Sequence, residues 1–151
     1  MIQHQEGVLD SPRYGIEASF ALGSEIDRFS IYINVYDGTH IYQGGWRYHH
    51  NELKMKVRTT GAAWVPVDDV IARSLDSAVF SRMKVVIDVD TGKYARAFLD
   101  NIEYPVSAVP LYIQTVANLP RIVVNIYLNG DDGENQVAYV DDVIVTSSEP
   151  L

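Results

Sequence analysis

Cysteine is absent from this chain of 151 residues. Its absence excludes disulfide bonds, thiolate metal sites and cysteine nucleophiles. It leaves the cellular compartment unknown, because cytosolic and secreted proteins can both lack cysteine. The chain also lacks any apolar run near the roughly 20 residues that a membrane-spanning helix needs, so we expect no membrane insertion. Residues Met1–Glu6 show no charged-then-apolar pattern of a secretory signal.

Basic residues are in the minority. The sequence has 12 Lys and Arg residues against 20 Asp and Glu residues, which gives a formal net charge of -8. A strongly negative protein repels the phosphates of nucleic acids and of anionic membranes, so we expect neither as a partner. Acidity by itself favours solubility and indicates nothing more specific.

Several motifs that carry enzyme chemistry are also missing. The chain has no Gly-x-Ser-x-Gly nucleophile elbow, no phosphate-binding loop and no Gly-x-Gly-x-x-Gly dinucleotide motif. His49 and His50 are adjacent, and on a strand they would point to opposite faces, so they could not share one metal ion. We expect two exposed loop histidines and no cofactor. These absences argue against an enzyme without excluding one.

The residues that are present predict short β-strands. Phe29–Tyr36 alternates an apolar face with a polar face, and Asp37-Gly38 follows it as a hairpin turn signal. Further segments alternate or have extended character, at 16–22, 39–43, 52–58, 64–67, 83–89, 94–99, 102–106, 121–128 and 136–146. Two segments stay ambiguous between strand and loop, 46–50 and 111–117. Residues 68–77 form the one plausible helix, of about two turns.

This pattern predicts an all-β, antiparallel sandwich or barrel with at most one short helix. At this length, residues 1–151 fit a single domain with its own hydrophobic core, and 147–151 would form a tail. Hydrophobic residues make up 47% of the sequence, and ten residues are tyrosines. Tyrosine suits half-buried strand positions, because its ring packs while its hydroxyl stays in water.

Two stretches resemble the concanavalin A-like lectin/glucanase superfamily. Residues 83–106 run from a strand with Asp88 through Thr91-Gly92-Lys93-Tyr94 to a strand that ends at Asp100-Asn101, as in laminin-G-like jelly rolls, where Asp-Gly is usual at the last position. Residues 139–145 are similar to the closing strand of such sandwiches. The resemblance implies a jelly-roll-like β-sandwich and leaves the specific family unknown. The chain is short for a complete jelly roll, which leaves open that it is a fragment of a longer protein.

Carboxylates offer only weak candidates for chemistry. Glucanases of this superfamily carry Glu-x-Asp-x-x-Glu, which is absent here, and Asp88 and Asp90 have no flanking Glu, so we expect Asp90 to belong to the turn. Asp131, Asp132 and Asp141 are a weak candidate for structural Ca²⁺, because they lack the spacing of a calcium loop. One of Asp141 and Asp142 should face the interior and need a hydrogen-bond partner.

One sheet face carries a more informative set of residues. Tyr32, Asn34 and Tyr36 lie opposite the apolar face of their strand, and Lys54, Lys56 and Arg58 do the same on theirs. The segment Tyr42-Gln43-Gly44-Gly45-Trp46-Arg47-Tyr48 adds two aromatic types and a guanidinium. If these strands are neighbours, rings flanked by amide and cationic donors form a surface on which sugars could bind. The alternative is an ordinary solvated face whose basic residues balance nearby acids.

The sequence therefore favours a non-catalytic, carbohydrate-binding or carbohydrate-enzyme-associated β-sandwich module. The predicted ligand contacts are Trp46, Arg47 and Tyr48, followed by Tyr32, Asn34 and Tyr36. Two alternatives remain. One is a structural sandwich that uses its tyrosine-rich face as a protein interface, for instance in a homo-oligomer. The other, which ranks lowest, is a glycoside hydrolase-like enzyme.

Overall fold

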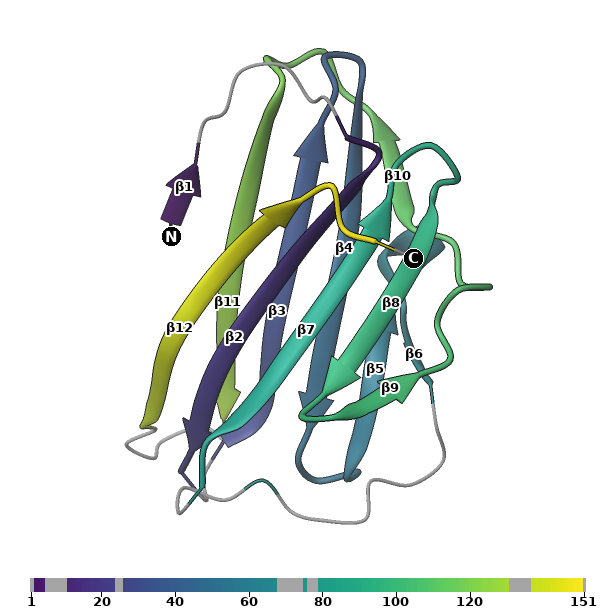
Figure 1. The fold of residues 1–151 in the computed structure, drawn as a ribbon. Helices are drawn as coiled ribbons and strands as arrows, with labels where there is room; N and C mark the ends of the chain where they lie inside the picture. Colours follow the sequence, from purple (N-terminus) through teal and green to yellow (C-terminus); the bar gives the residue numbers. More distant parts are fainter. Residues whose placement is uncertain are drawn as a thin grey trace.

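Two antiparallel β-sheets stack face to face and enclose the core (Figure 1). The computed structural model describes residues 2–4, 11–23, 26–67, 75, 79–130 and 137–150. Within this part of the chain the strands are β1 (Ile2–His4), β2 (Arg13–Leu22), β3 (Ile26–Tyr36), β4 (His40–His49), β5 (Lys54–Arg58), β6 (Trp64–Pro66), β7 (Ser81–Asp88), β8 (Lys93–Leu99), β9 (Ile102–Tyr104), β10 (Tyr112–Thr115), β11 (Arg121–Gly130) and β12 (Ala138–Ser147). A short 3₁₀ turn occupies Thr60–Ala62.

The larger sheet, called sheet A, has the strand order β1-β11-β3-β4-β5-β6, with β10 also paired to β4. The smaller sheet, called sheet B, has the order β12-β2-β7-β8-β9. Sheet B lies toward the viewer in Figure 1 and sheet A lies behind it. The arrangement confirms the predicted antiparallel, jelly-roll-like sandwich.

Alternation in β3 builds the centre of sheet A. Ile31, Ile33 and Val35 are fully buried between the sheets, whereas Tyr32 is half-buried on the outer side. The hairpin to β4 follows as predicted, with Gly38 at a φ of 107° that favours glycine. The Asp37 carboxylate accepts hydrogen bonds from the backbone N–H groups of Thr39 (2.7 Å) and His40 (2.6 Å), which holds the turn closed.

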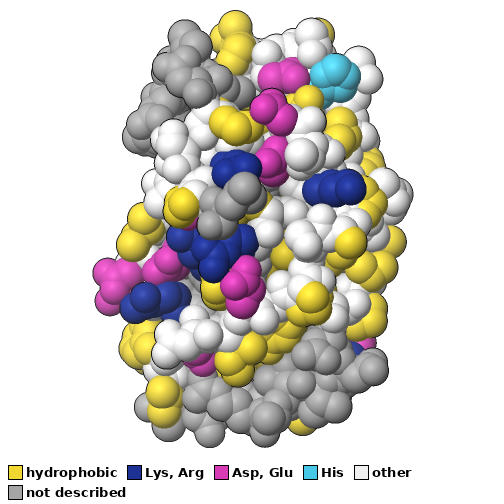
Figure 2. Space-filling model, turned by 45° about the vertical axis from the view of Figure 1, so that its right-hand side comes forward, with side chains coloured by type: hydrophobic (Ala, Val, Ile, Leu, Met, Phe, Trp, Pro, Cys, Tyr) yellow, Lys and Arg dark blue, Asp and Glu magenta, His cyan; other side chains and the backbone are white. Residues whose placement is uncertain are grey.

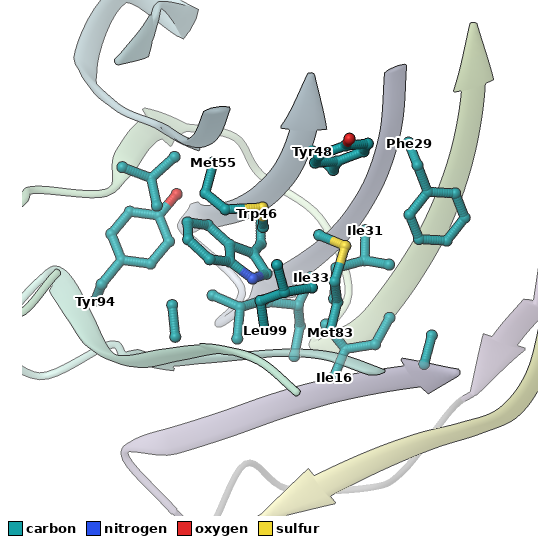
Figure 3. Packing of buried hydrophobic residues seen from close by; sticks show 14 of the residues in the cluster. Ile16, Phe29, Ile31, Ile33, Trp46, Tyr48, Met55, Met83, Tyr94 and Leu99 are labelled. Atoms are coloured by element: carbon teal, nitrogen blue, oxygen red, sulfur yellow. The ribbon is translucent and has the colours of Figure 1, made fainter. Parts of the chain in front are cut away.

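Aromatic and aliphatic side chains from both sheets fill the core (Figure 3). Trp46 and Tyr48 of β4 point inward and contribute to this layer, and both are 0% exposed. The Trp46 Nε1–H donates to the Phe98 carbonyl of sheet B at 2.8 Å, so the buried indole is also satisfied as a donor. Burial of these rings supplies the main driving force for sandwich formation.

Strand β4 changes partners along its length. Its residues from 46 to 49 pair with β5, and its residues from 40 to 43 pair with β10. At the junction, the buried hydroxyl of Tyr94 from sheet B accepts a hydrogen bond from the Gly45 N–H (2.9 Å) and donates one to the Arg58 carbonyl (2.5 Å). The Tyr94 side chain therefore replaces ladder hydrogen bonds at the point where β5 leaves β4.

Some local expectations are settled or corrected. The alternative left open for 46–50 is settled as strand over 46–49, and the strand expected at 39–43 does not end at Gly44 and Gly45, because β4 continues through both. Asp141 and Asp142 are both exposed, because the pairing of β12 with β2 shifts between Asp141 and Ile144 and neither carboxylate turns inward. The segment 111–117 contains the strand β10, which settles that alternative. The helix expected over 68–77 lies outside the described residues, apart from the buried Leu75. Among the described residues, no helix has the length and apolar character to cross a membrane.

Candidate functional site

A row of three aromatic rings crosses the outer face of sheet A. Tyr127 of β11 meets Tyr32 of β3 edge to face, with ring centroids 5.0 Å apart. Tyr32 meets Trp64 of β6 in the same manner at 5.4 Å. Tyr127 is 48% exposed, and Tyr32 and Trp64 are half-buried. The row therefore offers ring surface to solvent on a rigid, paired sheet.

Gly45 allows this row to close over β4. A Cβ atom at this position would lie 2.9 Å from the Trp64 ring, 3.1 Å from the Arg58 Cβ and 3.3 Å from the Tyr32 ring. Any side chain at residue 45 would therefore push these groups away from the sheet. Because Gly45 has no side chain, the Trp64 ring can pack over β4 and contact Tyr32.

Two guanidinium groups flank the row. Arg47 of β4 lies over the Trp64 ring, 3.8 Å from its centroid, and its Nε–H donates to the Ser30 hydroxyl at 2.8 Å. Arg58 lies 5.6 Å from the Tyr32 ring and 5.2 Å from the Tyr112 ring of β10. Burial lowers the pKa of Arg47, and the positive charges of Arg28 and Arg58 lower it further. Arginine nevertheless stays charged, because its ordinary pKa lies so high.

Unsatisfied polar atoms lie beside the rings. The Asn34 Oδ1, the Gln43 Oε1 and the Arg58 Nε are buried and have no hydrogen-bond partner. Asn34 is only 8% exposed, and it sits directly opposite Gln43 on the neighbouring strand. Buried polar groups without partners are uncommon in folded proteins, so water or a ligand is the natural partner here. We call the set Tyr32, Asn34, Gln43, Arg47, Arg58, Trp64, Tyr112 and Tyr127 the aromatic-basic face.

The structure brings part of the sequence-predicted site together. Tyr32, Asn34 and Arg47 lie on the aromatic-basic face, on the neighbouring strands β3 and β4. Tyr36 lies farther along β3, under the guanidinium of Arg121 at 4.5 Å. Trp46 and Tyr48 are corrections, because both point into the core. Successive strand residues face opposite sides, so an outward Arg47 requires its two neighbours to face inward.

Three aromatic members of the face were missed. Trp64, Tyr112 and Tyr127 reach it only because β6 pairs with β5, β10 pairs with β4 and β11 pairs with β3. Trp64 stands directly opposite Arg58 in this pairing. For Trp64, the sequence shows only that residues 64–67 are extended. That pattern does not indicate which face of the sheet its side chain occupies.

The weaker catalytic and metal candidates that the structure describes make contacts that hold the fold together. Asp88 is buried and accepts a hydrogen bond from Arg13 (3.1 Å) and one from the Thr91 N–H (3.0 Å), so it closes a turn. His49 is buried rather than exposed, and its Nε2 accepts from the Arg28 Nε–H at 3.0 Å. Asp131 and Asp132 lie outside the described residues. Within the described ranges, no three His, Asp or Glu side chains gather as metal ligands would, and Asp141 is exposed.

The outer face of sheet B differs in its charge arrangement. There, Arg82 pairs with Glu17 (3.3 Å), Lys84 with Glu149 (2.7 Å) and Arg96 with Glu103 (2.9 Å). Figure 2 shows basic side chains grouped with acidic ones beside them on this side of the molecule. A shallow cavity of about 190 Å³ lies among these pairs. Its cations are already neutralised, so this face attracts anions less than the aromatic-basic face does.

Comparison with known proteins adds a likeness in fold. No family model matches the chain, and no curated protein matches it. Among solved structures the chain is similar to the galectin LEC-6 of Caenorhabditis elegans, with 14% identity, 85% of this chain and 88% of that chain covered, and a TM-score of 0.46. At this identity and TM-score the likeness carries no argument about function.

Proposed function

We propose that the protein is a non-catalytic carbohydrate-binding module that holds its ligand on the aromatic-basic face. One observation supports this most strongly: three rings in a row, two guanidiniums and two unsatisfied amide oxygens share one face of a paired sheet. Sugars need this combination, because their C–H faces pack on rings and their hydroxyl groups exchange hydrogen bonds with polar groups.

Each group has a defined role in this proposal. The exposed ring of Tyr127 and the edge of Trp64 pack against sugar rings. The Asn34 and Gln43 oxygens are buried and reach the ligand through bridging water molecules, and the Arg58 guanidinium donates to sugar oxygens. The β-sheet positions these groups before the ligand arrives, which reduces the ordering cost of binding.

The aromatic row itself lacks the carboxylates that glycoside hydrolysis uses. Retaining and inverting glycosidases place two carboxylates on either side of the scissile bond. Among the described strands of sheet A, β4, β5 and β6 carry no Asp or Glu. The carboxylates of Asp27 and Glu52 lie beside the face and are paired with Arg28 and Lys56. The aromatic row itself therefore supports binding and carries no carboxylate.

A binding panel tests the proposal. Soluble neutral and acidic polysaccharides are titrated into the protein, and the dissociation constants are measured by calorimetry. We expect at least one glycan to bind, and Trp64→Ala to weaken that binding at least tenfold, because the variant removes the ring that Arg47 and Tyr32 contact. Phe98→Ala is the matched control. Its ring lies under Arg96 at 4.7 Å on the outer face of sheet B, and its loss should leave affinity within twofold.

The competing interface hypothesis is tested on the same proteins. Sedimentation velocity of the wild-type chain shows whether it self-associates. A dimer that Tyr32→Ala dissolves, together with no binding across the panel, would overturn the carbohydrate proposal and assign the face to a protein interface. Thermal unfolding of each variant confirms that a loss of binding does not reflect a loss of folding.

A further inference from the structure

The charges of the aromatic-basic face set it apart from the rest of the molecule. The whole chain carries a formal net charge of -8. Yet Arg47 and Arg58 have no ion pair within the described residues, whereas Arg28 and Lys56 on the neighbouring strands β3 and β5 bind Asp27 and Glu52 at 2.8 and 2.6 Å. The centre of this face is therefore a local positive region on an acidic protein. Such a region concentrates and orients anions.

Arg58 is the strongest anchor in this region. Its guanidinium is held between the rings of Tyr32 and Tyr112, and its Nε is buried without a partner. Its backbone is fixed independently, because the Arg58 carbonyl accepts from the Tyr94 hydroxyl. A guanidinium positioned in this way keeps free N–H donors in the planar fork that matches a carboxylate.

Arg47 adds a second cation, over the Trp64 ring of the row. Its guanidinium stacks on the Trp64 ring, and its Nε–H donates a hydrogen bond to the Ser30 hydroxyl. Its pKa is lowered by burial and by the neighbouring positive charges of Arg28 and Arg58. An anion near this face would relieve that repulsion, whereas a neutral ligand would not.

We infer that the face selects acidic sugars, and that the carboxylate of a uronic acid pairs with Arg58 while the sugar ring packs on the aromatic row. This inference rests on the proposed carbohydrate-binding function and names its ligand class. The outer face of sheet B lacks this selectivity, because Arg82, Lys84 and Arg96 are each already paired with a carboxylate.

The test compares each polyuronate with its own methyl ester. Polygalacturonate, alginate and hyaluronan are titrated in the acid form and as the full methyl ester, which removes the charge and keeps the sugar ring. We expect at least one acid form to bind at least tenfold more tightly than its ester. We also expect that affinity to fall as salt rises from 50 to 500 mM, because the Debye length falls below roughly 10 Å once the salt exceeds about 0.1 M and the exposed charges are then screened more strongly.

Variants locate the effect. Arg58→Gln should reduce the ratio of acid to ester affinity to within twofold, with Arg47→Gln as the second variant if Arg58→Gln unfolds. Arg96→Gln is the matched control, because Arg96 also lies over a ring, at 4.7 Å from that of Phe98, on the opposite sheet. Equal binding of acid and ester, or binding by neutral glycans alone, would overturn the inference and leave the proposed function standing. Retention of the preference in both sheet A variants would also overturn it. Absence of binding by every neutral and acidic glycan would instead overturn the proposed function.

Discussion

Replacement of Tyr94 by phenylalanine tests how the two sheets are joined beneath the candidate site. The change keeps the buried ring and removes only the hydroxyl. That hydroxyl accepts from the Gly45 N–H at 2.9 Å and donates to the Arg58 carbonyl at 2.5 Å, where β4 exchanges β5 for β10. Because neither β5 nor β10 pairs with β4 at Gly44 and Gly45, the variant leaves a donor and an acceptor on that side of β4 without their partner.

The magnitude follows from those two groups. A buried donor or acceptor left unsatisfied costs about 1–3 kcal/mol. Since a water molecule can reach part of the gap, we expect Tyr94→Phe to lower the free energy of unfolding by about 2 kcal/mol, which for a domain of this size lowers Tm by roughly 4–8 °C. Urea unfolding should show a lower midpoint with an unchanged slope. Tyr139→Phe is the control, because Tyr139 is 62% exposed.

Alkaline pH gives an independent measurement on the same variant. Burial raises the pKa of Tyr94 above its ordinary value of 10.0, and the hydrogen bonds from Gly45 and to Arg58 only partly oppose the shift. A group whose pKa is raised on folding stabilises the protein below the unfolded pKa and loses that stabilisation as pH rises above it. The wild type should therefore lose stability above about pH 10 more steeply than Tyr94→Phe. A stability loss below about 0.5 kcal/mol in the variant, with identical alkaline profiles, would refute the role assigned to this hydroxyl.

Two further perturbations probe the hairpin and the core. Gly44→Ala should lower the free energy of unfolding by about 1–3 kcal/mol in urea unfolding, because its Cβ would lie 2.3 Å from the Ile87 Cγ2 and force a shift in a packed core; an unchanged midpoint would contradict this. For Asp37, desolvation raises the pKa, but hydrogen bonds from Thr39, His40 and Tyr42 outweigh it and lower the pKa to about 2. Its contribution is therefore present above the ordinary value of 3.8 and is lost as pH falls toward 2, so the Tm difference between wild type and Asp37→Asn should shrink over that range and stay flat above pH 5.

The fold could be predicted wherever a strand alternates cleanly. Phe29–Tyr36 is one such segment, and the structure places its apolar residues in the core and Tyr32 outside. Strand β4 is the counterexample. Gly44 and Gly45 are residues that usually mark turns, so the sequence suggested that a strand ends there, whereas β4 runs through both. Only the surrounding side chains explain why glycine is needed at these positions.

The candidate site could be predicted in part. Alternation correctly places Tyr32, Asn34 and Arg47 on one side of sheet A, because that inference depends only on neighbouring residues. Trp46 is wrongly predicted as a ligand contact, because the same alternation that turns Arg47 outward turns Trp46 into the core. Trp64 could not be placed at all. Trp64 lies on the aromatic-basic face because β6 pairs with β5, and no local sequence pattern encodes that contact.

The two central glycines of β4 explain why the core and the candidate site cannot be understood separately. Gly44 faces inward and admits Ile87, whereas Gly45 faces outward and admits Trp64. At this point the backbone of one strand separates core packing from the aromatic row, with no side chain on either side. The Tyr94 hydroxyl holds that same backbone and the carbonyl of Arg58. The positions of Trp64 and Arg58 are therefore set by the packed interior and not by loops, and rigid elements hold a ligand-binding geometry more accurately than loops do.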